Sequence, residues 1–233
     1  MTNQLIHARV ERISPLTNSI LQLILAPDVY VDYHAGQYLQ IILDQEAFSY
    51  SIANAPLGSK KYELHIRHSH DNPYNQALLA NIRKHGEVTI HVPLGECHIS
   101  RLYPQKPILF IAGGTGFAPI KAMIEHLLAT DETRFFELYW GARSQSDLYM
   151  DEKVSHWQTH VSHFQYFSLL SETRKESLAS MVLERHKHDL NDWQIVIGGP
   201  FDMVYNTRDL LITKGALSEN LFSDAFSFET KNS

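Results

Sequence analysis

One segment limits the possible folds of this chain more than any other, because it reads as a buried strand, a turn of small residues and a helix in direct succession. The segment is ILFIAGGTGFAPIKAMIEHLL, residues 108–128. Its last part repeats apolar side chains at Ile120, Met123, Ile124 and Leu127, which is the spacing of one helix face. An apolar strand that leads into a helix is typical of a parallel sheet covered on both faces.

The rest of the chain shows two patterns, with a change near residues 101–107. Before the change, short runs separated by turn residues predict strands over 6–14, 19–27, 37–44, 48–54, 62–69 and 87–95, with one helix over 74–86. After it, strands over 135–143, 164–170 and 193–200 alternate with helices over 175–188 and 202–215. We therefore expect a two-domain β plus α/β protein, with an N-terminal antiparallel β-barrel over residues 1–102 and a C-terminal parallel-sheet domain over 103–233 that carries helices on both faces.

Composition and charge exclude several classes of protein. The formal charge is −6 and no basic block stands out, so we expect no nucleic-acid partner. No apolar run could cross a bilayer and the start, MTNQLIHARVERIS, lacks a signal-peptide pattern, so we expect a cytoplasmic protein without membrane insertion. A single cysteine, Cys97, excludes a disulfide or a cysteine-ligated zinc or iron–sulfur site within the chain. Of His65, His68 and His70, the first faces away from the second in a strand, so we expect no metal site.

The turn inside the opening segment has the chemistry of a phosphate-binding loop. Glycine lets the backbone approach a ligand closely, and N–H groups at the start of a helix attract a pyrophosphate. Pro119 replaces the third glycine of the usual dinucleotide fingerprint, which the first turn of a helix tolerates. A tight structural turn is the alternative, but its place between strand and helix favours NADH or NADPH binding. The residues assigned to it are Gly113, Gly114, Thr115, Gly116, Phe117, Ala118 and Pro119.

Two further stretches are candidates for the same ligand. The strand IVIGGPFDMV ends in Gly198, Gly199 and Pro200, which either line the same crevice with Met203 on the nicotinamide side or simply end the strand. The strand FFELYWGAR ends in Arg143, where the fingerprint expects an acid. Arg143 either contacts the adenosine end, including a 2′-phosphate, or is a solvated charge. The choice between NADH and NADPH therefore stays open.

The order of the motifs YSIAN, VPLGE, GGTGFAP, YWGAR and GGPFDMV resembles the ferredoxin–NADP⁺ reductase superfamily. It is most similar to the bacterial NAD(P)H:flavin oxidoreductases, and the likeness extends over nearly the whole chain to the ending LFSDAFSF, which is similar to their C-terminal strand. The resemblance implies that the barrel binds flavin. It also implies that Asp224 and Phe226 border the flavin ring, although an edge strand that only closes the sheet is the alternative.

In that superfamily a segment of the pattern R-x-[YF]-S-x-[AS]-[SN] binds the flavin. The corresponding residues here are Phe48, Ser49, Tyr50, Ser51, Ile52, Ala53 and Asn54. The resemblance implies that Tyr50 packs against the isoalloxazine or ribityl part and that Ser51, the catalytic candidate, bonds near flavin N5. Without the second half of the chain, a half-buried strand with outward serines would be the better interpretation.

Two departures from the family pattern concern how the flavin is held. Relatives that keep FMN or FAD as a prosthetic group usually have arginine where this chain has Phe48, and Glu46 adds a negative charge nearby, although Arg67 could compensate. Ile197 stands where many members carry cysteine. Riboflavin, FMN or FAD is therefore expected to bind as a substrate rather than as a tightly held group.

The resemblance implies direct hydride transfer from nicotinamide C4 to flavin N5, with release of reduced flavin to an unknown acceptor. The alternative within enzymology is a FAD-bound reductase component that passes electrons to an oxygenase or a ferredoxin. A non-catalytic flavin or nucleotide sensor is a third possibility.

Overall fold

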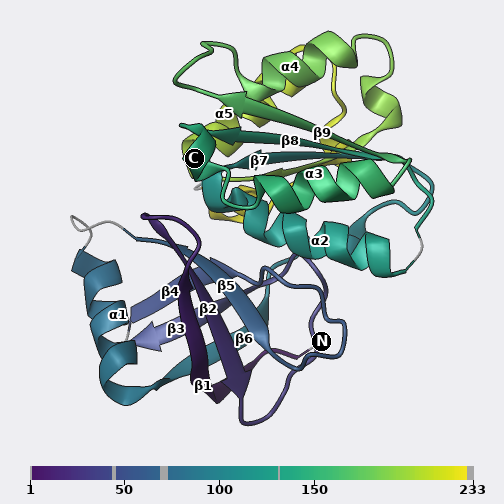
Figure 1. Ribbon diagram of the computed structural model, residues 1–233. Coiled ribbons are helices and arrows are strands. Elements are labelled where there is room, and N and C mark those ends of the chain that lie inside the picture. The colour runs from purple at the N-terminus through teal and green to yellow at the C-terminus, as the bar shows by residue number, and fades with distance from the viewer. Residues whose placement is uncertain (1, 44–45, 69–72, 131, 230–233) are drawn as a thin grey trace. The chain divides into compact units, whose positions relative to one another are not determined.

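The computed structural model describes residues 2–43, 46–68, 73–130 and 132–229. The chain forms two compact units (Figure 1): Met1–Ser100 with Lys121–Asp131, and Arg101–Ile120 with Glu132–Ser233. Helix α2 (Phe117–Ala129) is divided between them, since its residues from Lys121 onward group with the first unit. None of the helices in the described ranges is long and apolar enough to cross a membrane.

The first unit is a six-stranded antiparallel sheet that closes on itself. Its strands are β1 (Gln4–Pro15), β2 (Ile20–Pro27), β3 (Tyr38–Leu43), β4 (Glu46–Ser51), β5 (Tyr62–Arg67) and β6 (Glu87–Leu94). They are ordered β4-β3-β6-β1-β2-β5, and a bridge between Ile52 and Leu64 connects the two outer strands. Helix α1 (Pro73–His85) connects β5 to β6. The expected barrel is thus confirmed.

Alternating apolar side chains fill the interior of this barrel. Leu39 and Ile41 of β3 and Ile90 of β6 are fully buried, as the period of two in these strands predicts. Tyr62 lies in the same core, and its hydroxyl donates to the Val31 carbonyl oxygen at 2.8 Å and accepts from the Val31 N–H. The core therefore fixes β5 and the chain that follows β2.

The second unit is a five-stranded parallel sheet. Its strands are β7 (Ile108–Gly113), β8 (Phe136–Ala142), β9 (Phe164–Leu170), β10 (Gln194–Gly198) and β11 (Leu221–Phe222), in the order β11-β10-β7-β8-β9. Its other helices are α3 (Asp151–His160), α4 (Leu178–Arg185) and α5 (Phe201–Thr213). The strands predicted over 135–143, 164–170 and 193–200 all form, because runs of apolar residues are stable only where both faces are covered.

Helices cover both faces of this sheet (Figure 1). Leu178 of α4 and Leu211 of α5 share a core with Tyr139 of β8. On the other face, Asp151 of α3 accepts a hydrogen bond from Tyr166 of β9 at 2.7 Å. The sequence patterns do not predict α3, because its mostly polar side chains leave little apolar periodicity.

The C-terminal ending differs from the expected strand. Only Leu221 and Phe222 pair with β10, and residues Asp224–Phe228 form a 3₁₀ helix. The Ser223 side chain accepts from the Ala225 N–H, and this local hydrogen bond competes with strand pairing.

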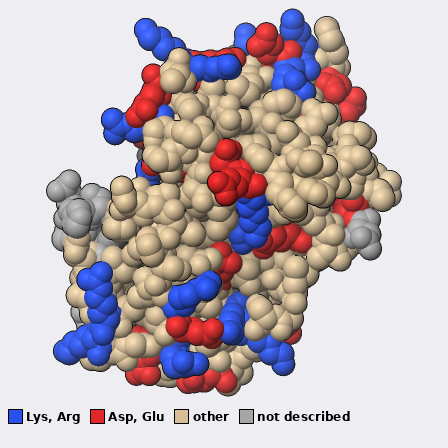
Figure 2. All heavy atoms as spheres, in the orientation of Figure 1, with Lys and Arg blue, Asp and Glu red and all other residues tan. Residues whose placement is uncertain are grey.

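Charged side chains of both signs are interspersed on the face of the molecule that Figure 2 shows, with large uncharged areas between them. Among the described residues, no group of three or more His, Cys, Asp or Glu side chains is placed to hold a metal ion. His70, one of the three histidines considered above, lies outside the described residues.

Candidate functional site

Two glycine turns lie against each other at the carboxyl ends of neighbouring parallel strands. β7 runs into a 3₁₀ turn over Gly114–Gly116, and β10, which pairs with β7, ends at Gly198. A Cβ atom on Gly116 would overlap the backbone of Gly198 and Gly199. The two turns are therefore in backbone contact, which only glycine at position 116 permits.

The first turn has a left-handed backbone at Gly114, where φ is 53°. A Cβ atom built there would meet nothing within 4 Å, so the space beside this residue is open. The Gly114 carbonyl oxygen accepts a hydrogen bond from Trp140 Nε1 at 3.0 Å, and Phe117 stacks on the same indole at 4.0 Å. Trp140 thus stabilises the turn through this hydrogen bond and this stacking contact. The sequence motifs do not identify Trp140, because an aromatic residue inside an apolar strand looks like any other core residue.

Met203 and Pro200 cover the second turn. Pro200 precedes α5, and the Met203 methyl group lies 2.6 Å from the position of a Cβ on Gly113, so its side chain closes over that glycine. The Thr207 hydroxyl donates to Met203 Sδ at 3.5 Å and fixes this rotamer. Gly113, Gly199, Pro200 and Met203 are thus brought together, as the sequence motifs predict for one crevice.

The remaining predicted nucleotide-binding residues differ in exposure. Phe117 and Ala118 are buried, so contacts with a ligand would have to use their backbone, whereas Thr115 and Pro119 are partly exposed. Arg143 follows β8 and its side chain is 81% exposed, with Nε 3.4 Å from Glu172 Oε1. An exposed pair of this length contributes little to stability.

The residues of the paired turns fit a dinucleotide. The turn offers glycine backbone, open space beside Gly114 and the first N–H groups of a helical segment, which are the donor set that binds a pyrophosphate. Ile197, which the family resemblance aligns with a position that is cysteine in many members, is a buried core residue, so no thiol stands there.

The predicted flavin segment occupies β4 and the chain just after it. Ser49 is exposed and its Oγ accepts from Gln40 Nε2 at 3.3 Å. Phe48, Tyr50 and Ser51 are half-buried. Tyr50 packs against the barrel core, and burial raises the pKa of its hydroxyl to about 12, so it remains a neutral ring at physiological pH. Tyr50 and Ser51 are both partly exposed, and their aromatic ring and hydroxyl are the kinds of group that an isoalloxazine needs for stacking and hydrogen bonding.

The second half of the flavin segment, Ile52 to Asn54, is fixed by burial and by hydrogen bonds to β5. Ile52 and Ala53 are fully buried. Asn54 Oδ1 accepts from the Glu63 N–H at 2.8 Å and its Nδ2 donates to the Lys61 carbonyl oxygen at 3.0 Å. The amide of Asn54 therefore bonds to β5 and the residue before it.

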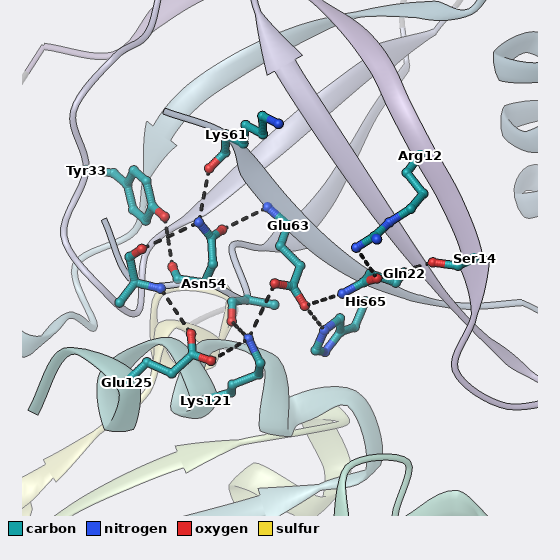
Figure 3. A network of polar contacts seen from close by, with 12 residues as sticks. Arg12, Ser14, Gln22, Tyr33, Asn54, Lys61, Glu63, His65, Lys121 and Glu125 are labelled. Carbon is teal, nitrogen blue, oxygen red and sulfur yellow. Dashed lines mark hydrogen bonds and ion pairs between the residues drawn. The ribbon is translucent and has the colours of Figure 1, made fainter. Parts of the chain in front are cut away.

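A polar network contacts the residues that follow β4, through Ala53 and Asn54 (Figure 3). Glu63 of β5 accepts from His65 Nε2 and Gln22 Nε2, both at 2.8 Å, and pairs with Lys121 Nζ at 3.4 Å. Burial acts to raise the pKa of Glu63, but the hydrogen bond from His65 and the charge of Lys121 outweigh it and lower this pKa to about 2. Burial lowers the pKa of His65 below its usual value. The sequence did not point to Lys121, because a lysine at a helix position normally faces solvent.

The last predicted residues lie at the ends of strands or beyond them. Arg67 is the final residue of β5 and is exposed. Asp224 and Phe226 lie in the second unit, in the 3₁₀ helix that follows β11. Arg208 of α5 lies 5.4 Å from the centre of the Phe226 ring, and Tyr205 donates to the Ala225 carbonyl oxygen at 2.9 Å, so α5 fixes this ending.

Comparison with known proteins agrees with this geometry. The model of the oxidoreductase NAD-binding domain family matches residues 110–209. A cytochrome P450 reductase of Amycolatopsis has the same fold, with a TM-score of 0.84 at 21% identity over 95% of this chain and 69% of that one. A ferredoxin NADP⁺ reductase of Neisseria gonorrhoeae gives a TM-score of 0.74 at 15% identity over 92% of this chain and 93% of that one.

The closed antiparallel sheet, the parallel sheet and the NAD-binding match define an oxidoreductase with the fold of the ferredoxin–NADP⁺ reductase superfamily. An NAD(P)H-flavin reductase of Vibrio harveyi is 30% identical over 235 residues, which cover 96% of this chain and 99% of that protein. The chain belongs to the NAD(P)H-flavin reductase family.

A second relative has a different name and role. A CDP-6-deoxy-L-threo-D-glycero-4-hexulose-3-dehydrase reductase of Yersinia pestis is 30% identical over 213 residues. The match covers 89% of this chain but 64% of that protein, so this chain spans just under two thirds of its length.

Proposed function

We propose that this protein catalyses the NAD(P)H-dependent reduction of free riboflavin, FMN or FAD and releases the reduced flavin. The observation that carries the proposal is the half-buried pair Tyr50 and Ser51, which lies at the end of β4, where the sequence has Phe48 two residues before Tyr50. A ring and a hydroxyl can hold an isoalloxazine, whereas phenylalanine cannot pair with a flavin phosphate. Kinship with flavin reductases over the whole chain supports the same reaction.

When bound, the nicotinamide coenzyme would supply a hydride from C4 and the flavin would accept it at N5, with NAD(P)⁺ as the other product and solvent as the source of the proton that completes the reduced flavin. The protein contributes binding and orientation. Ser51 donates a hydrogen bond to N5, and Tyr50 packs against the flavin. Gly114, Thr115 and Gly116 bind the pyrophosphate through their backbone, and Met203 lies on the nicotinamide side.

The proposal treats the flavin as a substrate that leaves after each turnover. Phe48 offers a phosphate no charge, so affinity comes from the ring and the ribityl chain. Such a reductase works in the cytoplasm and delivers reduced flavin to a diffusible or protein acceptor whose identity the chain does not specify. The single cysteine excludes a cysteine-ligated iron–sulfur cluster within this chain as the next electron carrier.

The test combines a spectrum with an assay. The purified protein is expected to be colourless, without the visible absorbance of a bound flavin. It is expected to oxidise NADH or NADPH only when riboflavin, FMN or FAD is added in excess over the enzyme. A yellow protein that retains stoichiometric flavin through gel filtration would favour a reductase component with bound FAD. Oxidation of NADH and NADPH that does not respond to any flavin would contradict the proposal and favour a sensor.

A further inference from the structure

Lys121 is an unusual residue for its position, because its side chain is almost completely buried, with 2% exposed. Its ammonium donates to the Ala53 carbonyl oxygen at 2.8 Å. It also pairs with Glu125 Oε1 at 3.0 Å and with Glu63 Oε2 at 3.4 Å (Figure 3). All four residues belong to the first unit. The ammonium therefore has one backbone partner and two carboxylate partners.

Stability alone does not account for this arrangement. Removing a lysine ammonium from water is costly, and an apolar side chain of similar volume often serves a fold equally well. The two carboxylates recover much of the cost, but they are themselves partly desolvated, with 14% of the Glu63 side chain and 18% of the Glu125 side chain exposed. A buried ion cluster of this kind suggests that the backbone it contacts has to keep one fixed conformation.

The geometry that Lys121 fixes is that of the flavin segment. Ala53 follows Ser51 by two residues, and the Ala55 N–H donates to Glu125 Oε2 at 3.4 Å. The Asn54 carbonyl oxygen accepts from the Tyr33 hydroxyl at 2.8 Å. Three consecutive residues after the strand are thus held by side chains, and Lys121 orders two of the contacts because it binds Ala53 directly and orients Glu125.

We propose that Lys121 is a positioning residue for the flavin site: its ammonium holds the Ala53 carbonyl group and, with Glu125, sets the backbone that presents Tyr50 and Ser51 to the flavin. The inference rests on the proposed function, since it assumes that β4 binds flavin. Lys121 itself is not assigned a contact with either reactant. Its effect therefore falls on flavin binding and turnover, while affinity for the nicotinamide coenzyme is retained.

The test uses Lys121→Met, which keeps the length of the side chain without its charge, and Lys121→Arg, which keeps the charge. Lys61→Met is the matched control, because Lys61 is an exposed lysine of the same unit whose ammonium pairs with the exposed Glu11 carboxylate. Riboflavin affinity is measured by quenching of riboflavin fluorescence without NADH, and KM and kcat are then measured for flavin and for NADH. Circular dichroism and thermal unfolding show whether each variant is folded.

Lys121→Met is expected to weaken riboflavin binding about 10-fold or more and to lower kcat, with KM for NADH within about 2-fold of the original protein. Lys121→Arg should recover most of the riboflavin affinity, and Lys61→Met should match the original protein. If Lys121→Met does not fold because Glu63 and Glu125 lose their counter-charge, Lys121→Met with Glu125→Gln removes one carboxylate and takes its place. A folded Lys121→Met or double variant with unchanged riboflavin affinity overturns the inference.

The two proposals fail in different ways. An original protein that neither binds riboflavin nor reduces it would refute the proposed function, and the positioning role with it. An original protein that binds and reduces riboflavin, alongside a folded Lys121→Met variant that does so equally well, would refute only the role of Lys121. Equal loss of affinity for riboflavin and NADH would also refute it, because general destabilisation does not discriminate between the two ligands.

Discussion

Ser49 and Ser51 lie two positions apart on β4, yet their surroundings differ. Ser49 is exposed and bonded to Gln40, whereas Ser51 is half-buried at the point where the strand enters the anchored chain of Ala53 and Asn54. A hydroxyl that must donate to a reacting nitrogen needs a fixed backbone. The difference in anchoring supports the assignment of the catalytic role to Ser51.

Ser51→Ala is expected to lower kcat for flavin reduction roughly 10- to 100-fold, because one hydrogen-bond donor to the reacting atom is lost. KM for NADH should change little. Ser59→Ala, in the exposed turn between β4 and β5, is the control and should leave the rate unchanged. Steady-state kinetics with riboflavin check both, and an unchanged rate in Ser51→Ala would remove the N5 assignment.

Glu63 and His65 make the first unit sensitive to acid. The folded pKa of Glu63, about 2, lies below its ordinary value of 4.5, so its contribution to stability is complete above pH 4.5 and is lost as the pH falls toward 2. Burial also lowers the pKa of His65, which favours the unfolded state below about pH 6.5. Both lowered pKa values therefore make the folded protein less stable as the pH falls.

Glu63→Gln is therefore expected to reduce the loss of stability between pH 5 and pH 2 by up to about 3 kcal/mol. The protein should be less stable than the original at pH 7, because Lys121 and His65 lose a charged partner. Urea unfolding at several pH values measures this. Glu11→Gln is the control, since the exposed pair of Glu11 with Lys61 is screened by water; an equal effect in both variants would contradict the assignment.

At the scale of elements, the paired turns after β7 and β10 show why a glycine pattern carries information. Gly116 is required because another chain segment occupies the place of its side chain, whereas Gly114 is required by its backbone angle and has open space beside it. The sequence shows both as glycine and cannot distinguish the two reasons. The open space beside Gly114 is consistent with a pyrophosphate that approaches the turn on that side.

Gly116→Ala is expected to destabilise the second unit by roughly 1–3 kcal/mol, because the added methyl group forces the two turns apart. KM for NADH should rise more than KM for riboflavin. Gly114→Ala should lower the free energy of unfolding by less, on the order of 1 kcal/mol, since alanine there is strained only by the left-handed backbone. Thermal unfolding and coenzyme kinetics of both variants provide the comparison, and an equal cost would contradict the overlap with Gly198.

Elements with a strong apolar period were predictable, and those set by polar contacts were not. β8 forms over Phe136–Ala142, within the predicted range 135–143, and its first five residues are buried, because such an apolar run has to be covered on both faces. α3 lacks a wide apolar stripe, and its position depends on single contacts such as Asp151 with Tyr166. The ending after Phe222 turns into a 3₁₀ helix through local hydrogen bonds that a strand-like pattern does not reveal.

At the scale of the whole molecule, each unit carries one part of the proposed reaction. The barrel presents Tyr50 and Ser51, and the parallel sheet presents the paired glycine turns. The flavin reductase of Vibrio harveyi matches this chain over 99% of its length, whereas the Yersinia pestis reductase extends well beyond the matched region. Under the proposed function, the first unit would bind the flavin and the second unit the nicotinamide coenzyme.

The sequence by itself determined the two kinds of sheet, the order of the strands and helices with a strong apolar period, and the residue types of both candidate ligand-binding segments. These follow from local periodicity and from glycine and aromatic side chains whose chemistry is the same in any context. Only the tertiary structure decided that Gly116 lies against Gly198, that Trp140 donates a hydrogen bond to the first turn and that the buried Lys121 donates to the Ala53 carbonyl oxygen. Such contacts join residues far apart in the chain, and burial and charge pairing there depend on which side chains the fold brings together.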